Sequence, residues 1–250
     1  MELLANESLA VAPKNALVLL NGDLETNIPM YYHYCEGFRK DLTLLSMNHL
    51  TYDWFEDYKA LYATVTFPKG RYHPTFGYNL RDLISANMEN RSITIFGNIV
   101  PGDHSFDIED GFEFKRLGLG FEVRKAPPSS SSSLSLTECD SEFNQILKTN
   151  PPANISISSK ALILGTWQQE LLVLVYRMKN ANTAKALVAL ASKCPFPEFQ
   201  SKLMQYCVDI FTHLENYFDL FSDSERAEME DVFKFCYSRN QELCPPKDPK

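Results

Sequence analysis

The chain has 250 residues, of which 44% are hydrophobic, and this is enough for one large domain or two of ordinary size. It carries 24 basic and 32 acidic side chains, for a net charge of −8. This acidity disfavours binding to nucleic acid or to anionic membranes, because both need a cationic surface.

Short strands that alternate with helices are expected in residues 1–125. Apolar and β-branched runs predict strands over residues 16–20, 42–47, 62–67 and 92–96, and apolar residues spaced by three and four predict helices over residues 30–40, 51–61 and 79–88. Alternating apolar residues over 106–123 predict a terminal hairpin, with turns at Asp110-Gly111 and Gly118. The first half is therefore expected to be an α/β or α+β domain, and periodicity leaves open whether its sheet is parallel or antiparallel.

A segment rich in proline and serine separates the two halves. Residues 126–158 contain Pro127-Pro128, the serine run 129–133 and Pro151-Pro152, which predict a solvated linker that holds one candidate short helix over 136–149. The boundaries that follow are residues 1–125 for the first domain, 126–158 for the linker, 159–240 for a second domain and 241–250 for a tail.

Long helices are expected in the second half. Apolar periodicity predicts helices over residues 160–179, 183–193 and 197–220, and the last has Pro197 in its first turn. Ser222 and Glu225 have the spacing of a capping box and predict the start of another helix. Antiparallel helices with short connections favour an all-α bundle as the C-terminal domain.

Cysteine usage and the chain ends favour an intracellular protein. Residues 1–7 lack the basic region of a secretory signal, and the most apolar run, 161–178, contains Gln168-Gln169-Glu170 and is too polar for a membrane span. The six cysteines lack a repeated spacing, which predicts reduced thiols rather than a disulfide framework. We therefore expect a soluble cytoplasmic or nuclear protein, in which the Asn-X-Ser sequons at Asn6, Asn90 and Asn154 carry no modification.

One candidate ligand site follows the first predicted strand. Asn21-Gly22-Asp23 comes where open α/β sheets bind ligands, so Asn21 and Asp23 could meet a nucleotide or phosphate. Lys69 and Arg71 would supply positive charge there. No phosphate loop, catalytic motif or paired metal-ligand spacing is present in the sequence, so we predict no catalytic residue, no metal and no cofactor.

Aromatic residues suggest a second kind of site, for a partner protein. Arg71, Tyr72 and Phe76 belong to the one basic and aromatic loop, and three phenylalanines, Phe218, Phe221 and Phe235, lie beside the apolar stripes of the last helices. We predict that these six residues bind a partner.

The leading hypothesis is a non-catalytic subunit or adaptor of an intracellular hetero-oligomeric complex, with protein partners and no membrane contact. Two alternatives stay open: an α/β enzyme that acts on a nucleotide or phosphorylated substrate at the end of the first strand, and an RNA-binding module that uses the loop from Arg71 to Phe76.

Overall fold

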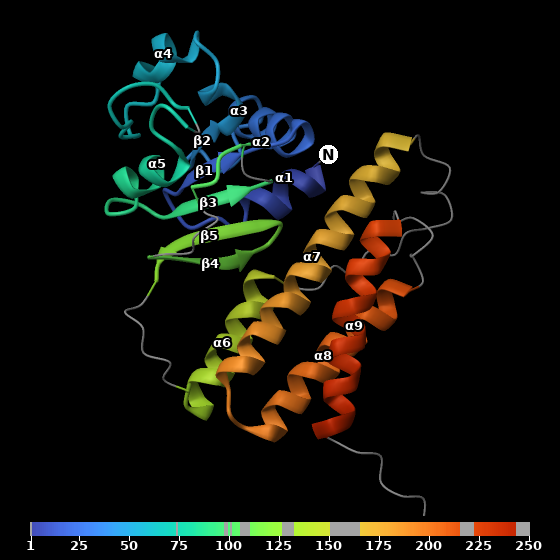
Figure 1. The fold of residues 1–250 in the computed structure, drawn as a ribbon. Coiled ribbons are helices and arrows are strands. Elements are labelled where there is room, and N and C mark those ends of the chain that lie inside the picture. Colours follow the sequence, from blue (N-terminus) through green and yellow to red (C-terminus); the bar gives the residue numbers. More distant parts are fainter. Residues whose placement is uncertain are drawn as a thin grey trace, which may run out of the picture. The chain divides into compact units, whose positions relative to one another are not determined.

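The computed structural model describes residues 2–73, 75–97, 100, 102–105, 111–126, 133–150, 166–215 and 223–243. The chain divides into two units, residues 1–129 and 130–250 (Figure 1). Each unit has an apolar core of its own.

Unit 1 contains a mixed sheet, whose strand order over the described residues is β2-β1-β3-β5-β4. β1 (Leu17–Leu20) lies between β2 (Thr43–Ser46) and β3 (Ile93–Phe96) and pairs with both in parallel. β5 (Gly120–Lys125) pairs antiparallel with β3 and with β4 (Phe112–Leu117). The expectation of a mixed α/β fold is thus confirmed, and the open question of strand direction is answered by a sheet that contains both.

β1 is buried on both faces of the sheet. All four of its side chains are inaccessible to solvent, as its unbroken apolar sequence predicts for a central parallel strand. Leu17 and Leu19 share a core cluster with Leu83 and Ile84 of α5 (Leu80–Asn87). α5 begins with a capping box, in which the Asn79 side chain accepts a hydrogen bond from the amide of Asp82.

Arg39 anchors the N-terminal helix α1 (Glu2–Leu9) to the rest of unit 1. Its guanidinium donates hydrogen bonds to the carbonyls of Leu9 (2.7 Å), Ala10 (3.1 Å) and Ala12 (3.0 Å), which come at and after the end of the helix. It also pairs with Asp41 through Nε and Oδ1 at 2.8 Å, and this hydrogen bond holds the pKa of Asp41 well below its usual range. Arg39 therefore supplies hydrogen-bond donors to the carbonyls at the end of α1, and its positive charge is paired with the carboxylate of Asp41.

The helices between β1 and α5 differ from those predicted. In place of the predicted helices 30–40 and 51–61 the structure has elements with other boundaries: α2 (Asp23–Tyr34), α3 (Met47–Leu50), α4 (Phe55–Tyr58) and the 3-10 helix η1 (Lys59–Leu61). α2 starts directly after Gly22, which has a φ of 104°. After α2 the region contains only short helices of three or four residues among its described residues, and several of its aromatic side chains are exposed.

The strand predicted over residues 62–67 does not form. The side-chain amide of Asn87 accepts a hydrogen bond from the backbone N–H of Thr66 and donates one to the Thr66 carbonyl, both at 2.8 Å. Arg91 donates to the carbonyl of Thr64 at 3.1 Å. Side chains thus satisfy backbone groups that a neighbouring strand would otherwise pair.

The described elements of residues 130–250 are α6 (Leu136–Thr149), α7 (Thr166–Lys193), α8 (Pro197–Glu215) and α9 (Asp223–Leu243). Figure 1 shows α7, α8 and α9 running side by side. Their core includes Leu187, Leu203 and Phe211, all nearly inaccessible to solvent. Residues 216–222, 151–165 and 244–250, which include the predicted cap Ser222, lie outside the described residues.

α7 runs through the point where we predicted a break between two helices, at residues 179–183. The buried hydroxyl of Thr183 lies within hydrogen-bond distance of the carbonyls of Asn150 (2.9 Å) and Lys179 (2.8 Å), and its single proton is shared between these two acceptors. The polar residues 179–183, which resemble an interhelix connection in the sequence, therefore lie inside a continuous helix, where the Thr183 hydroxyl has hydrogen-bond partners.

A disulfide joins Cys139 of α6 to Cys194, which directly follows α7. The two Cα atoms are 6.1 Å apart and the cysteines are separated by 55 residues. The expectation that all cysteines are reduced is therefore wrong for this pair, because folding brings together two cysteines whose spacing carries no recognisable pattern.

Candidate functional site

The carboxyl end of β1 was the expected ligand site. The backbone N–H of Gly22 donates to Asn21 Oδ1 at 3.0 Å, and Asn21 is buried. A Cβ atom at Gly97, the residue after β3, would stand 1.8 Å from the carbonyl oxygen of Asn21. Asp23 is exposed as the first residue of α2. The backbone after β3, at Gly97, thus lies in close contact with the backbone after β1, at Asn21.

Lys69 and Arg71 lie elsewhere, in a hollow of about 790 Å³ formed by residues 68–78 and α5. Phe76, which is 89% exposed, also lines it, whereas Asn21 and Asp23 do not. Arg71 forms an ion pair with Asp53 and donates to the carbonyl of Thr51 at 2.9 Å. We predicted that Lys69 and Arg71 would lie beside Asn21 and Asp23. The hollow that contains the two basic residues does not include Asn21 or Asp23.

Tyr72, predicted to bind a partner, is a core residue that is only 1% exposed. Its hydroxyl donates a 2.6 Å hydrogen bond to Asp103 Oδ2, which also accepts the backbone N–H of Leu80 at 2.9 Å. Burial raises the pKa of Tyr72, and the hydrogen bond to Asp103 raises it further. Burial raises the pKa of Asp103 as well, but hydrogen bonds from Ser105, Tyr72 and Leu80 outweigh it, so the pKa of Asp103 is lowered.

A second hollow in unit 1 is lined largely by aromatic rings. It has a volume of about 580 Å³ and is formed by α2, β2, α3, α4, η1 and residues 62–64. We call it the aromatic cleft and define it by six of its lining residues: Tyr34, His49, Trp54, Tyr58, Tyr62 and Thr64. Tyr34 is 61% exposed, so much of this lining is open to solvent.

Trp54 organises the rings at this cleft. Its ring lies 5.5 Å from that of Tyr58 at 87° and 5.3 Å from that of His49. It stacks on Tyr52 at 5.8 Å and 13°. Trp54, Tyr58 and Tyr52 are each about half exposed, at 46%, 51% and 52%. Apolar faces held in fixed mutual geometry and left open to solvent are typical of ligand-binding surfaces.

The aromatic cleft is lined by no acidic side chain, no lysine and no arginine among the residues that the structure describes in unit 1. Burial lowers the pKa of His49, which favours the neutral imidazole. Burial, with a smaller contribution from Tyr34, raises the pKa of Tyr62 to about 12, so its hydroxyl stays protonated. The cleft therefore offers rings, hydroxyls and imidazoles, which suit an uncharged polar ligand.

Sequence reasoning missed this cleft. The spacing of Trp54, Phe55, Tyr58 and Leu61 resembles the buried stripe of a helix over 51–61. In the structure Phe55 is buried, but Leu61 is 76% exposed, because the segment breaks into α4 and η1. Four aromatic residues within seven positions, from Tyr52 to Tyr58, were the available signal.

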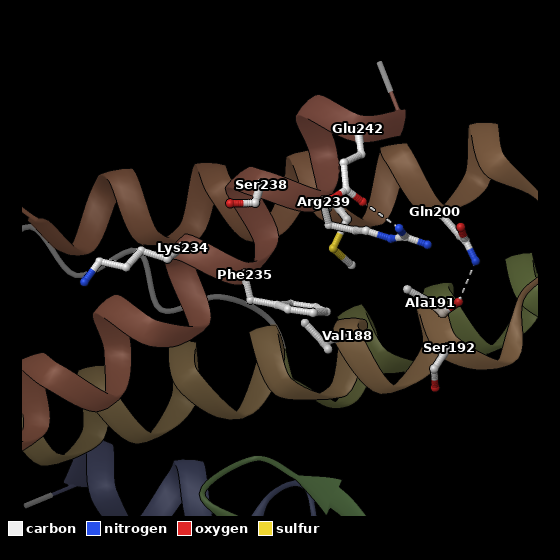
Figure 2. A pocket seen from close by; sticks show the side chains of 10 residues that line it. Val188, Ala191, Ser192, Gln200, Lys234, Phe235, Ser238, Arg239 and Glu242 are labelled. Carbon is white, nitrogen blue, oxygen red and sulfur yellow. Dashed lines mark hydrogen bonds and ion pairs between the residues drawn. The ribbon is translucent and has the colours of Figure 1, made fainter. Parts of the chain in front are cut away.

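A hollow of about 660 Å³ lies between α7, α8 and α9 in unit 2, and its lining side chains are drawn in Figure 2. Phe235 of α9 is 53% exposed and extends toward Val188 of α7. At one end of the hollow Arg239 pairs with Glu242 at 2.6 Å. The other two phenylalanines predicted to bind a partner, Phe218 and Phe221, lie outside the described residues.

Within the described ranges, no helical segment has the length and continuous hydrophobicity that a membrane span requires. In the same ranges no group of three or more His, Cys, Asp or Glu side chains is arranged to hold a metal ion.

Known proteins that are similar to this chain include two protein O-mannosyl-transferases. The chain is 44% identical over 97 residues to protein O-mannosyl-transferase tmem260 of Dictyostelium discoideum, a match that covers 38% of this chain and 12% of that protein. It is 33% identical over 108 residues to protein O-mannosyl-transferase TMEM260 of Mus musculus, covering 40% of this chain and 15% of that protein. No family model and no solved structure matches the chain.

These relatives correct the functional expectations. Their names designate enzymes, so the prediction of a non-catalytic subunit or adaptor is wrong, and neither the nucleotide-directed enzyme nor the RNA-binding module gains support. The symbol TMEM designates a transmembrane protein. The expectations of a soluble, cytoplasmic or nuclear protein with protein partners and no membrane are wrong on the same finding.

Proposed function

We propose that this chain serves in protein O-mannosyl transfer and that its aromatic cleft binds the mannose unit. The observation that carries the proposal is the 44% identity over 97 residues to a protein O-mannosyl-transferase. Because the chain covers only 12% and 15% of the length of its two relatives, the proposal concerns a sugar-binding role within such an enzyme.

The chemistry of the cleft supports this role. Mannose is an uncharged ring that carries hydroxyl groups around apolar C–H faces. The negative face of an aromatic ring attracts such C–H groups, and Trp54 and Tyr58 are half exposed at the cleft. Tyr34, Tyr62 and His49 offer hydroxyl and imidazole groups that can donate and accept hydrogen bonds. A cleft lined, among the described residues, by no carboxylate, lysine or arginine favours such a ligand over a nucleotide or a phosphate.

We also propose that the two units are separate domains, a mixed α/β domain that bears the cleft and an all-α domain after the Pro/Ser-rich segment. Support comes from the division of the chain between Ser129 and Ser130 and from the two separate cores. The mannose-binding role is assigned to the first of them.

The test is to titrate the full chain with methyl α-mannoside and with a serine-containing peptide that carries O-linked mannose. Binding is monitored by tryptophan fluorescence. We expect saturable binding that Trp54→Ala or Tyr58→Ala weakens at least about tenfold, the loss of roughly 1.4 kcal/mol. Phe76→Ala, which removes an exposed ring outside the cleft, is the matched control. Because Trp54→Ala removes the reporter, isothermal calorimetry replaces fluorescence for that variant.

Binding of mannose that survives both cleft substitutions would refute the assignment of the cleft. Absence of binding to any mannose-bearing probe would refute the sugar-binding role itself.

A further inference from the structure

One Asn-X-Ser sequon is presented on the surface of unit 1. Asn90 lies in the turn between α5 and β3, is exposed, and precedes Arg91 and Ser92. Its backbone N–H donates to the carbonyl of Asn87 at 3.1 Å. An exposed asparagine in a surface turn, with a hydroxyl residue two positions later, is the acceptor required for N-linked glycosylation.

The neighbouring backbone holds this sequon in place. Arg91 donates to the carbonyl of Asn15 through Nη2 at 2.8 Å and to Thr43 Oγ1 at 2.8 Å. The carbonyl of Ser92 accepts the backbone N–H of Leu17 at 2.9 Å. The residue after Asn90 is thus turned onto the protein while Asn90 itself stays exposed.

The disulfide is a second and independent observation. Disulfides form and persist in oxidising environments, namely the endoplasmic reticulum lumen, the extracellular space and the bacterial periplasm. The bond between Cys139 and Cys194 therefore indicates that this chain folds in such an environment. In eukaryotic cells the lumen is also where sequons meet the glycosylation machinery.

The other sequons differ from this one. Asn6 lies within α1, and the hydroxyl of its sequon partner Ser8 is buried and donates to the carbonyl of Leu4. Asn154 lies outside the described residues. Asn90 is thus the one sequon that the described part of the chain presents in a surface turn.

We propose that Asn90 carries an N-linked oligosaccharide. The donor is an oligosaccharide linked to a lipid diphosphate. The amide nitrogen of Asn90 forms a bond to C1 of the first sugar, the bond from C1 to the diphosphate oxygen breaks, the amide nitrogen loses one proton, and the lipid diphosphate leaves. The modification is independent of the mannose-binding role proposed for the cleft.

The experiment uses the natural protein, tagged at its own gene and isolated from the cells that make it. Peptide:N-glycosidase treatment is expected to increase its electrophoretic mobility, and treatment in H₂¹⁸O is expected to convert Asn90 to ¹⁸O-labelled Asp in the peptide mass spectrum. Asn90→Gln and Ser92→Ala should each abolish the ¹⁸O label. Each should also increase the mobility of the untreated protein by the shift that corresponds to one glycan. Ser92→Thr, which keeps the hydroxyl, should retain both signals, and Asn6→Gln should leave them unchanged.

An unmodified Asn90 peptide in the untreated natural protein would overturn the proposal. So would a mobility step that is lost in Asn6→Gln but retained in Asn90→Gln. Because Ser92→Ala leaves Asn90 in place and changes only one hydroxyl, loss of the label in that variant, with an unchanged circular dichroism spectrum, identifies the sequon rather than misfolding as the cause.

Discussion

The hydroxyl of Tyr72 donates a 2.6 Å hydrogen bond to the carboxylate of Asp103, and both side chains are buried. The same carboxylate accepts backbone N–H groups from Leu80 and Ser105, each at 2.9 Å. Asp103 thus joins the loop of Tyr72, the first turn of α5 and its own loop. Removal of any donor leaves a buried carboxylate less completely solvated by the protein.

Tyr72→Phe is expected to lower the free energy of unfolding of unit 1 by about 1.5–3 kcal/mol, the contribution of a hydrogen bond to a charged group. Tyr78→Phe is the matched control, because the buried hydroxyl of Tyr78 has no hydrogen-bond partner among the described residues. Urea unfolding monitored by tryptophan fluorescence measures both variants, in a Trp167→Phe background that leaves Trp54 as the single tryptophan. Equal losses for the two tyrosines would contradict the role assigned to Asp103.

Acid should weaken unit 1 through Asp103. Its pKa in the folded chain is lowered, so the stabilisation by its carboxylate is fully present above the unfolded pKa of about 3.9. That stabilisation is lost as the pH falls through the lower, folded pKa. In Asp103→Asn the free energy of unfolding should be smaller at pH 7 and should fall less steeply below about pH 4. An unchanged slope in urea titrations at several pH values would show that Asp103 does not contribute.

The close approach at the strand ends predicts a severe effect for Gly97→Ala. The residue has a φ of 86°, and the new Cβ would stand 1.8 Å from the carbonyl oxygen of Asn21. Gly70→Ala is the control, since Gly70 has a φ of 89° but no atom within 4 Å of its added Cβ. We expect about 1 kcal/mol of strain for Gly70→Ala and several kcal/mol for Gly97→Ala. Similar thermal midpoints for the two variants would mean that φ alone governs the cost.

The disulfide should stabilise unit 2 substantially. A closed loop of 55 residues corresponds to about 4 kcal/mol in the chain-entropy description. Cys139→Ser combined with Cys194→Ser should therefore lower the thermal midpoint of the helical circular dichroism signal. A reducing agent should lower the midpoint of the natural chain and leave that of the double variant unchanged. A reductant effect of equal size in both chains would point to other cysteines.

Some features of unit 1 follow from local sequence, and others do not. The apolar run of β1 predicted a buried strand, and the alternating residues around Gly118 predicted a hairpin with a turn there, so these elements were anticipated. The extended segment 62–67 was assigned to the sheet because β-branched residues do not reveal that Asn87 and Arg91, more than 20 residues away, satisfy its backbone.

The candidate site was missed for a related reason. A helical period in residues 51–61 does not reveal that the helix breaks and leaves Trp54 and Tyr58 half exposed. The basic residues Lys69 and Arg71 were found as a group, but their distance from Asn21 depends on loop paths that the sequence does not specify. Pairing of Cys139 with Cys194 depends on how α6 packs on α7, which spacing cannot show.

The bond between Cys139 and Cys194 makes a covalent ring of the residues between them. A protease that cuts once inside this ring, for example after Lys160, produces two fragments that stay attached to each other. Such a nicked chain migrates as a single species on a gel until a thiol is added. The protein can therefore survive backbone cleavage in this stretch without losing its C-terminal portion.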